Sequence, residues 1–295
     1  MKKVIFGIIV LLFVLPMTSL AYSTKAATKY PIVLSHGMGA QAEILGGLID
    51  YWGSIPSTLK NNGASVYITS VNAMDSTENK AAQWKAQVLQ ILAVSGKEKI
   101  NLIGHSHGTI YSRYAITNLG MSSKVASHTS IAGPHRGSVI ADMIMGILPN
   151  WLEDIGGPVV NWVFALIMGD ENGDSVANGY ALVRSNMINV FNPNTPNVPG
   201  IYYQSYAYKI TNALGGGLML ATWGLMKPYE GDNDGLVSVS SAKWGNFRGV
   251  IDGGFWSWLG GVNHLGAVGL LSAPAGYDAP THFVNMAADL KNRGF

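Results

Sequence analysis

Residues 104–108 read Gly-His-Ser-His-Gly, so Ser106 stands at the centre of a G-x-S-x-G motif. A serine hydroxyl attacks a carbonyl only when a base takes its proton, and it must be presented outward on a tight turn. Glycines on both sides allow that turn, because a side chain there would collide with the neighbouring strand and helix. In a chain with 36 glycines the motif alone is weak, and an ordinary serine at a strand–helix turn is the alternative. The apolar run before the motif and the helical pattern after it favour a nucleophile.

A histidine base is expected after Ser106, in the chain order Ser, then Asp or Glu, then His. The downstream histidines are His107, His128, His135, His264 and His282. His107 adjoins the serine, and His128 lies in a strand pattern. His135 precedes every good acid candidate. His282 lies in a helix pattern, where a surface or capping role is expected. His264, in the loop 260–266, is therefore the predicted base, and a loop histidine without a role is the alternative.

Three acids precede His264 closely enough to orient it: Asp232, Asp234 and Asp252. Asp234 stands in an Asn-Asp-Gly turn that borders the strand-like residues 236–239. A carboxylate there can accept the second N–H of the base, which fixes its tautomer and stabilises the imidazolium. Ordinary turn chemistry favours the same three residues, so the spacing alone leaves the acid open.

Acyl transfer also needs two backbone N–H groups aimed at the developing oxyanion. One is expected from His107, the residue after the serine, and the other from the loop after an early strand. Residues 36–39 (HGMG) form that loop, which nominates the N–H of Met38. The side chains of His36 and His105 are expected to orient these loops rather than to do chemistry.

The elements that would position these residues alternate along the chain. Apolar or β-branched runs predict strands at 31–35, 65–71, 100–103, 125–131, 202–208 and 236–239. Helix patterns lie within 51–61, between the predicted N-cap Asp75 and Gly96, from the serine turn to about Leu119, and at 281–292. Glu78 completes a capping box with Asp75 in this interpretation. The alternation predicts one α/β domain over 28–295, with a mostly parallel sheet flanked by helices.

The N-terminus is typical of an export signal. Lys2 and Lys3 precede an apolar run at 4–15, and small residues near Ala21 offer a cleavage site, with 26–27 as a second candidate. A membrane anchor is the alternative, but this run is short against the roughly 20 apolar residues of a spanning helix. Loss of both lysines takes the net charge from +2 to zero, so no nucleic-acid partner is expected. The chain has no cysteine, which excludes disulfides and thiolate metal sites.

Six motifs together resemble the true bacterial lipases of the Pseudomonas type. They lie at residues 28–39, 50–56, 94–108, 132–138, 233–237 and 263–265. The likeness is close up to residue 138 and patchy afterwards. It implies an α/β-hydrolase fold and cleavage of long-chain acylglycerols at an oil–water interface. Matching the motifs residue by residue implies Ser106 as nucleophile, Asp234 as acid and His264 as base, with the N–H groups of Met38 and His107 as the oxyanion hole.

The chain departs from that family at the position two residues after the base. Relatives carry a calcium-binding aspartate there, and this chain has Gly266, with no aspartate between Tyr208 and Glu230 to supply another carboxylate. Calcium needs several hard oxygen ligands, so no metal and no other cofactor is predicted. Many relatives also have a disulfide, which this chain cannot form. The need for a folding chaperone and the oligomeric state stay open.

Residues 138–170 lie where these lipases insert their lid, and the segment is rich in apolar residues. We expect part of it to be a helical lid in transient contact with a lipid–water interface, with a buried helix pair or a subunit contact as the alternative. The predicted function is a secreted triacylglycerol lipase that acts on a lipid or ester substrate, with the periplasm as the alternative destination. An esterase for short-chain or polymeric esters and an inactive hydrolase-fold binding protein are the rival hypotheses.

Overall fold

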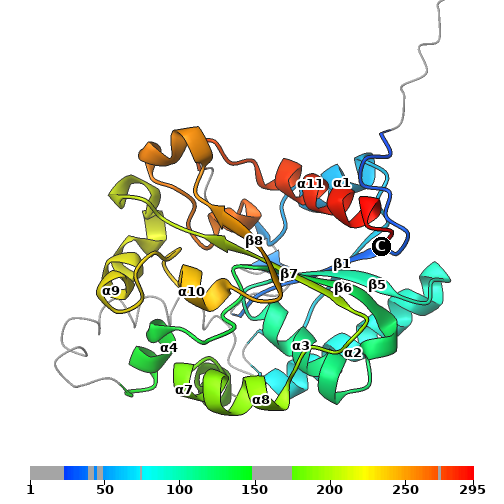
Figure 1. Ribbon diagram of the computed structural model, residues 1–295, viewed down its shortest axis with the longest axis horizontal. Coiled ribbons are helices and arrows are strands. Elements are labelled where there is room, and N and C mark those ends of the chain that lie inside the picture. Colours follow the sequence, from blue (N-terminus) through cyan, green and yellow to red (C-terminus); the bar gives the residue numbers. More distant parts are fainter. Residues whose placement is uncertain (1–22, 39–42, 45–48, 74, 148–174, 272–273) are drawn as a thin grey trace, which may run out of the picture.

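Six parallel strands form the centre of the computed structural model (Figure 1). In chain order they are β1 (Ile32–Ser35), β4 (Val66–Thr69), β5 (Ile100–His105), β6 (Val125–Ile131), β7 (Tyr202–Tyr208) and β8 (Asn246–Ile251). They lie in the order β4-β1-β5-β6-β7-β8, and each neighbouring pair is parallel. A short antiparallel pair, β2 (Glu43–Ile44) and β3 (Ile49–Asp50), stands apart. The structure describes residues 23–38, 43–44, 49–73, 75–147, 175–271 and 274–295.

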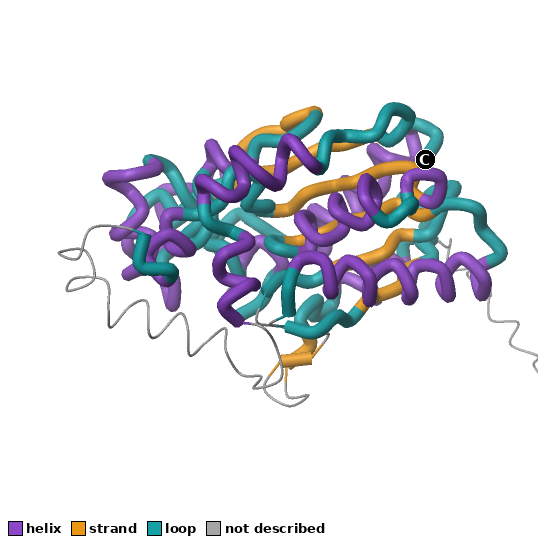
Figure 2. Tube along the Cα trace, turned by 90° about the horizontal axis from the view of Figure 1, so that it is seen from below, coloured by secondary structure: helices purple, strands orange, loops and turns teal. Residues whose placement is uncertain are grey.

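Helices cover both faces of the sheet, as the alternating pattern predicted. α1 (Ile55–Asn61) and α11 (Ala279–Asn292) lie on one face, and α2 (Thr77–Ser95) and α3 (Gly108–Asn118) lie on the other. The view from below shows helices crossing in front of the strands (Figure 2). Among the described residues, the other α-helices are α4 (Val139–Ile144), α6 (Ser175–Ala181), α7 (Arg184–Asn186), α8 (Asn192–Asn194), α9 (Leu220–Glu230) and α10 (Val239–Ala242).

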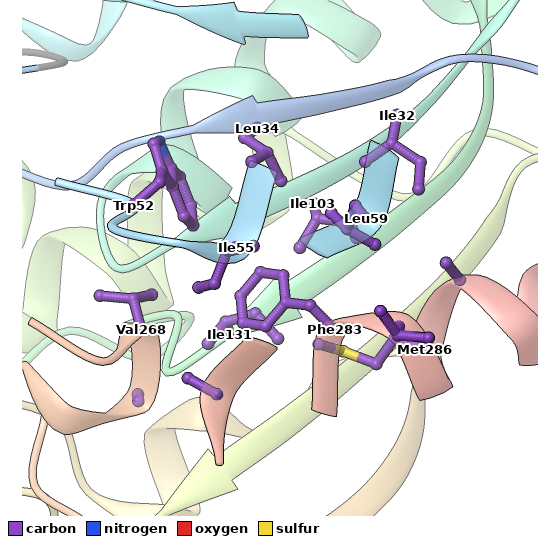
Figure 3. Packing of buried hydrophobic residues seen from close by; sticks show 14 of the residues in the cluster. Ile32, Leu34, Trp52, Ile55, Leu59, Ile103, Ile131, Val268, Phe283 and Met286 are labelled. Atoms are coloured by element: carbon purple, nitrogen blue, oxygen red, sulfur yellow. The ribbon is translucent and has the colours of Figure 1, made fainter. Parts of the chain in front are cut away.

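The core on the α1 and α11 side is built from strand residues and aromatic side chains (Figure 3). Phe283 of α11 is fully buried and stacks edge-on against Trp52, with ring centroids 6.0 Å apart. Leu34 and Ile103 reach the same cluster from β1 and β5. A second core on the opposite face packs α2 and α3 against the other side of the same strands, including Val33 and Leu102. Strands buried on both faces explain why the runs at 31–35 and 100–103 are almost wholly apolar.

Helix α2 begins one residue later than predicted. Ser76, not Asp75, is its N-cap, and the Ser76 hydroxyl accepts a hydrogen bond from the N–H of Asn79 at 3.2 Å. Asp75 instead accepts bonds from Ser76 N at 2.7 Å and from Asn79 Nδ2 at 2.8 Å. The capping box with Glu78 was therefore wrong, because two adjacent residues could both cap and the serine has the extended backbone that a cap requires. Gly96 ends the helix in the left-handed conformation, as expected.

The strand predicted at 236–239 was also wrong. Residues 233 and 238 form only an isolated bridge, and Val239 already begins α10. The last strand of the sheet is β8, which the sequence did not indicate. β8 lies at the edge, its side chains alternate between exposed and half-buried, and it therefore lacks the apolar run that marks a central strand.

The start of the predicted lid is part of the core. Val139, Ile140 and Met143 of α4 are buried against Met226 of α9. Ser138 caps α4 and donates a 2.6 Å hydrogen bond to the carbonyl of Leu236. Met143 therefore packs inside the protein and does not face lipid. The rest of the predicted lid, from 148 to 170, lies outside the described residues, as does the predicted signal sequence 1–21.

The first and last described residues lie together at one end of the molecule. The N–H of Lys29 donates to the carbonyl of Phe295 at 2.8 Å, and Lys291 Nζ donates to the carbonyl of Thr24 at 2.7 Å. Figure 1 shows this end on the side away from α9. Within the described ranges, no helix is both long and apolar enough to cross a bilayer.

Candidate active site

Ser106 lies on the sharp turn between β5 and α3 with a φ of +54°. A non-glycine residue rarely adopts this left-handed backbone, and a serine held there is the geometry of a nucleophile elbow. The turn is tied down because the N–H of Ser106 donates to the carbonyl of Ile131 on β6 at 2.9 Å. A Cβ on Gly108 would lie 2.2 Å from the carbonyl oxygen of Ser35, and one on Gly104 would lie 3.0 Å from Gly108 C. Both glycines are thus required by close approach, as predicted.

Asp234 and His264 form a buried hydrogen-bonded pair. The distance from Asp234 Oδ2 to His264 Nδ1 is 2.8 Å, and their side chains are 1% and 3% exposed. The other carboxylate oxygen, Oδ1, accepts bonds from the N–H groups of Leu236 at 3.0 Å and Val237 at 2.7 Å. The backbone N–H of His264 also donates to the carbonyl of Asp234 at 2.8 Å. Because the carboxylate accepts from Nδ1, the lone pair of His264 is left on Nε2, where a general base needs it.

The two other candidate acids do not reach His264. Asp232 and Asp252 both face Lys209, with Nζ–O distances of 3.2 Å and 3.8 Å. Asp252 also accepts a hydrogen bond from the N–H of Gly254 at 3.0 Å. Geometry thus separates three aspartates that spacing alone left open.

The loop after β1 lies directly against Ser106. A Cβ on Gly37 would lie 2.8 Å from Ser106 Cβ and 3.3 Å from Ser106 Oγ. In the part of the chain that the structure describes, no hydrogen-bond acceptor is paired with the backbone N–H of Met38 or of His107. Two unpaired donors beside a serine on a strained turn fit the requirement for an oxyanion hole. Ser106 Oγ makes no hydrogen bond to His264 among the described residues, and such bonds often tighten only when substrate binds.

His105 links the serine turn to the base loop. Its Nε2 lies 3.1 Å from the carbonyl oxygen of His264, and its ring contacts the His264 ring at a tilt of 39°, with centroids 4.6 Å apart. Because a carbonyl can only accept, Nε2 carries the proton and Nδ1 must accept. The hydroxyl of Tyr51 therefore donates to His105 Nδ1 and accepts from the N–H of Gly37 at 3.0 Å. This chain of bonds joins the serine turn, the Gly37 loop and the base loop. Tyr51 lies in the motif at 50–56, but sequence reasoning assigned it no role.

The other histidines are held in the neutral form by burial. Burial, and secondarily the His264 ring, keeps the pKa of His105 well below its usual range. Burial lowers the pKa of His36 to about 4 and, with Lys80 nearby, holds the pKa of His107 well below its usual range. His36 accepts from the N–H of Val71 at 3.0 Å, so it anchors its loop as predicted.

Three downstream histidines serve packing. His135 Nε2 lies 2.7 Å from the Ser130 hydroxyl, and His128 Nε2 lies 3.1 Å from that of Ser112. His282 packs edge-on against the Tyr206 ring, with centroids 5.1 Å apart, so it is half-buried rather than a surface residue.

The residues around Gly266 do not fit a calcium ion. Gly266 is buried in a short 3-10 turn that the Asn263 side chain holds, through a 2.8 Å bond from the N–H of Gly266 to Asn263 Oδ1. Among the described residues, no three His, Cys, Asp or Glu side chains gather in a way that could hold a metal. The base loop is thus held by Asn263 and by the Asp234 backbone, and calcium independence stays a prediction.

Known proteins resemble this chain in sequence and in fold. Residues 31–166 match the family of palmitoyl protein thioesterase. A triacylglycerol lipase of Vibrio cholerae is 35% identical over 241 residues, which are 74% of this chain and 75% of the relative. A triacylglycerol lipase of Pseudarthrobacter phenanthrenivorans is 37% identical over 161 residues, which are 52% of this chain and 50% of the relative. The mature form of the Bacillus licheniformis lipase BlEst2 superposes with a TM-score of 0.64 at 20% identity, covering 88% of this chain and 92% of that one.

Proposed function

This chain belongs to the triacylglycerol lipases and is a carboxylic ester hydrolase of the α/β-hydrolase fold, and from that premise we propose that Ser106, His264 and Asp234 are its catalytic triad. The observation that carries this proposal is the buried 2.8 Å Asp234–His264 bond at the same end of the sheet as a serine with positive φ. The parallel topology supports it, because β5 and the segments after β7 and β8 all leave the sheet at its carboxyl edge.

In the first step the Ser106 oxygen bonds to the ester carbonyl carbon while His264 Nε2 takes the hydroxyl proton. The C=O π-electron pair moves onto the carbonyl oxygen, which the N–H groups of Met38 and His107 stabilise. Asp234 remains ionised and stabilises the imidazolium. The ester C–O bond then breaks, and the leaving alcohol takes the proton from His264 Nε2.

The acyl group is then bound to Ser106 as an ester. Water attacks the same carbonyl carbon while His264 takes one of its protons, and the second tetrahedral intermediate collapses to the free acid. The returned proton restores the Ser106 hydroxyl. The neutral, buried His105 supports this cycle, because a second cation next to His264 would disfavour the imidazolium.

We propose long-chain acylglycerols as the substrate, export after removal of residues 1–21, and activity without calcium or another cofactor. The names of the two relatives support the substrate, and the poor fit around Gly266 supports the independence from calcium. Thioester hydrolysis is the second candidate activity, because the family match at 31–166 is to a palmitoyl protein thioesterase. The same triad attacks an acyl thioester with a thiol as leaving group.

The test is a chain-length series of acyl esters and one palmitoyl thioester, with and without chelator, beside Ser106→Ala. Fast hydrolysis of emulsified long-chain esters that the variant loses and chelator does not change is the expected result. Activity only on short soluble esters would make the protein an esterase. A preference for the thioester would replace the lipase proposal, and loss of activity on chelation would contradict the calcium proposal. A rise in rate above the solubility limit of the ester would support a lid within 148–170.

A further inference from the structure

Two loops beside the candidate base expose an unusual number of large apolar side chains. One is the aromatic loop, residues 253–261, and the other is the leucine turn, residues 213–220. The docking face is defined here by the exposed side chains of Leu214, Leu218, Leu220, Phe255, Trp256, Trp258, Leu259 and Leu271. Phe255 is 83% exposed and Trp258 is 61% exposed. In Figure 1 the two loops lie at the end of the molecule that carries α9.

The aromatic loop is fixed to the leucine turn and to the two residues before that turn. The N–H of Thr211 donates to the carbonyl of Gly260 at 2.9 Å, and Asn212 Nδ2 donates to the carbonyl of Trp258 at 2.8 Å. A Cβ on Gly215 would lie 1.8 Å from the carbonyl oxygen of Gly260, so the backbones of the two loops are in direct contact. Backbone bonds therefore hold the aromatic side chains outward, and their exposure is not a frayed loop end.

A pocket of about 270 Å³ opens between the loops. Its lining includes Leu214 and Leu218 from the leucine turn and Leu259 from the aromatic loop. Asn263 and Leu265, the two neighbours of His264 in the chain, complete the wall on the side of the base. Asn263 Nδ2 also donates to the carbonyl of Gly215 at 3.0 Å. The pocket thus borders the loop that carries the candidate base, although the side chains of the proposed triad do not line it.

Charge identifies what this face can bind. Residues 210–226 and 253–277 contain no Asp, Glu, Lys or Arg. An uncharged face has no attraction for anionic lipid headgroups or charged proteins, while exposed tryptophans are typical of a lipid–water interface. A second protein copy seated here would cover the pocket beside the base loop, whereas a lipid surface would bring ester substrate to the end of the sheet that carries the proposed triad.

We propose that the docking face inserts into the surface of neutral acyl lipid and presents the pocket and the active site to that phase. This inference rests on the proposed function and deepens it. It assigns interfacial binding to residues far along the chain from the predicted lid at 138–170, and it requires no movement of that segment.

The experiment compares two double variants for binding to trioleoylglycerol droplets coated with phosphatidylcholine. Phe255→Ser/Trp258→Ser changes the docking face, and Leu89→Ser/Val94→Ser changes two exposed apolar residues of α2 as a matched control. Binding is measured by flotation of purified protein carrying Ser106→Ala, so no turnover occurs. The face variant should need at least about tenfold more lipid for half binding, and the control should stay within about twofold.

Activity on a soluble short-chain ester, measured with Ser106 intact, separates this inference from the proposed function. The face variant should keep kcat/KM within about twofold of the parent, because the changed side chains lie away from the triad. If the parent hydrolyses no ester, the proposed function fails while the droplet binding remains readable. If the double variant does not fold, Phe255→Ser alone carries the test, since its side chain is 83% exposed.

Three results would overturn the inference. The first is droplet binding by the face variant that equals that of the control. The second is binding that requires anionic vesicles, which an uncharged face does not explain. The third is a parent protein that sediments as a dimer while the face variant sediments as a monomer, which would make the face a contact between two copies.

Discussion

The polar surroundings of Ser106 and the docking face lie at the same end of the sheet, but they are built in opposite ways. Around Ser106 the polar groups are buried and hydrogen-bonded: His105, His264 and Asp234 are almost wholly inaccessible. On the docking face the apolar side chains are exposed, and the hydrogen bonds join Thr211 and Asn212 to the backbone carbonyls of Gly260 and Trp258.

The contrast matches the two tasks that our proposals assign to this enzyme, catalysis and binding to a lipid surface. Buried dipoles fixed before the reaction stabilise charge that develops in the transition state. Exposed apolar side chains contribute favourable free energy only when they are transferred out of water, as they would be at a lipid surface. Changes in the first region should therefore alter the chemical step on every substrate, and changes in the second should alter only the encounter with emulsified lipid.

Ser106→Ala should have the largest effect. Loss of the attacking oxygen should lower kcat on a soluble ester by roughly 10⁶-fold, while droplet binding stays unchanged. The measurement pairs ester hydrolysis with labelling by an alkylphosphonate, which should modify the parent and not the variant. Ser123→Ala, at an exposed serine, is the control. Substantial activity in the Ser106 variant would remove this residue from the proposed triad.

Asp234→Asn should lower kcat by about 10⁴-fold on soluble and emulsified esters alike. The asparagine oxygen can keep the bonds from Leu236 and Val237, which places its NH₂ group toward His264 Nδ1. A donor there forces the histidine into the tautomer that has no lone pair on Nε2. Asp232→Asn serves as the control and should stay within about threefold of the parent, because Asp232 is half-exposed and pairs with Lys209. Equal losses in both variants would contradict the assignment of the acid.

Acid should unfold the protein through its buried histidines. Burial lowers the pKa of His36 to about 4, that of His128 to about 3 and that of His282 to about 4, against 6.5 in the unfolded chain. The unfolded state therefore binds more protons below pH 6.5, and stability falls as pH drops from 6.5 toward 4. Each such histidine lowers the free energy of unfolding by about 1.4 kcal/mol per pH unit in this window. Thermal unfolding followed by circular dichroism from pH 8 to pH 4 measures it, and a Tm that stays constant below pH 6.5 would contradict it.

Tyr51→Phe should lower kcat by roughly ten- to a hundredfold with little change in KM, because one hydroxyl is removed from two buried partners. The N–H of Gly37 loses its acceptor and His105 Nδ1 loses its donor. The link between the oxyanion loop and the base loop is then broken while ring packing stays. Tyr180→Phe, at an exposed tyrosine, should leave both constants unchanged. An unchanged kcat in Tyr51→Phe would show that the bond chain does not position the reacting groups.

The sequence predicted the parts of the site that local patterns encode. The strand–Ser106–helix turn was recognisable because both flanking glycines and the apolar strand adjoin the serine. The choice of Asp234 came from the family resemblance, since three aspartates had suitable spacing and only the folded chain brings one of them to His264. The role of Tyr51 could not be predicted, because it depends on contacts with His105, 54 positions away, and with the backbone of Gly37.

The errors in the predicted fold also arose because contacts between residues far apart in the sequence decide the structure. Residues 236–239 have β propensity, but the turn around Asp234 uses the N–H groups of Leu236 and Val237, so they do not join the sheet. β8 has weak propensity and becomes a strand because β7 offers an open edge. The sequence analysis made no prediction for the aromatic loop, because its position depends on hydrogen bonds to Thr211 and Asn212, more than 40 positions earlier in the chain.

The pairing of Lys29 with Phe295 brings the two ends of the described chain to one pole, and the docking face occupies the other. A support attached through either end would hold the protein with its active site toward the bulk phase. A short peptide that joined the two ends, with a new start at an exposed loop, would keep the sheet order intact. The same geometry suits this chain to oriented immobilisation and to circular permutation without alteration of the face that meets lipid.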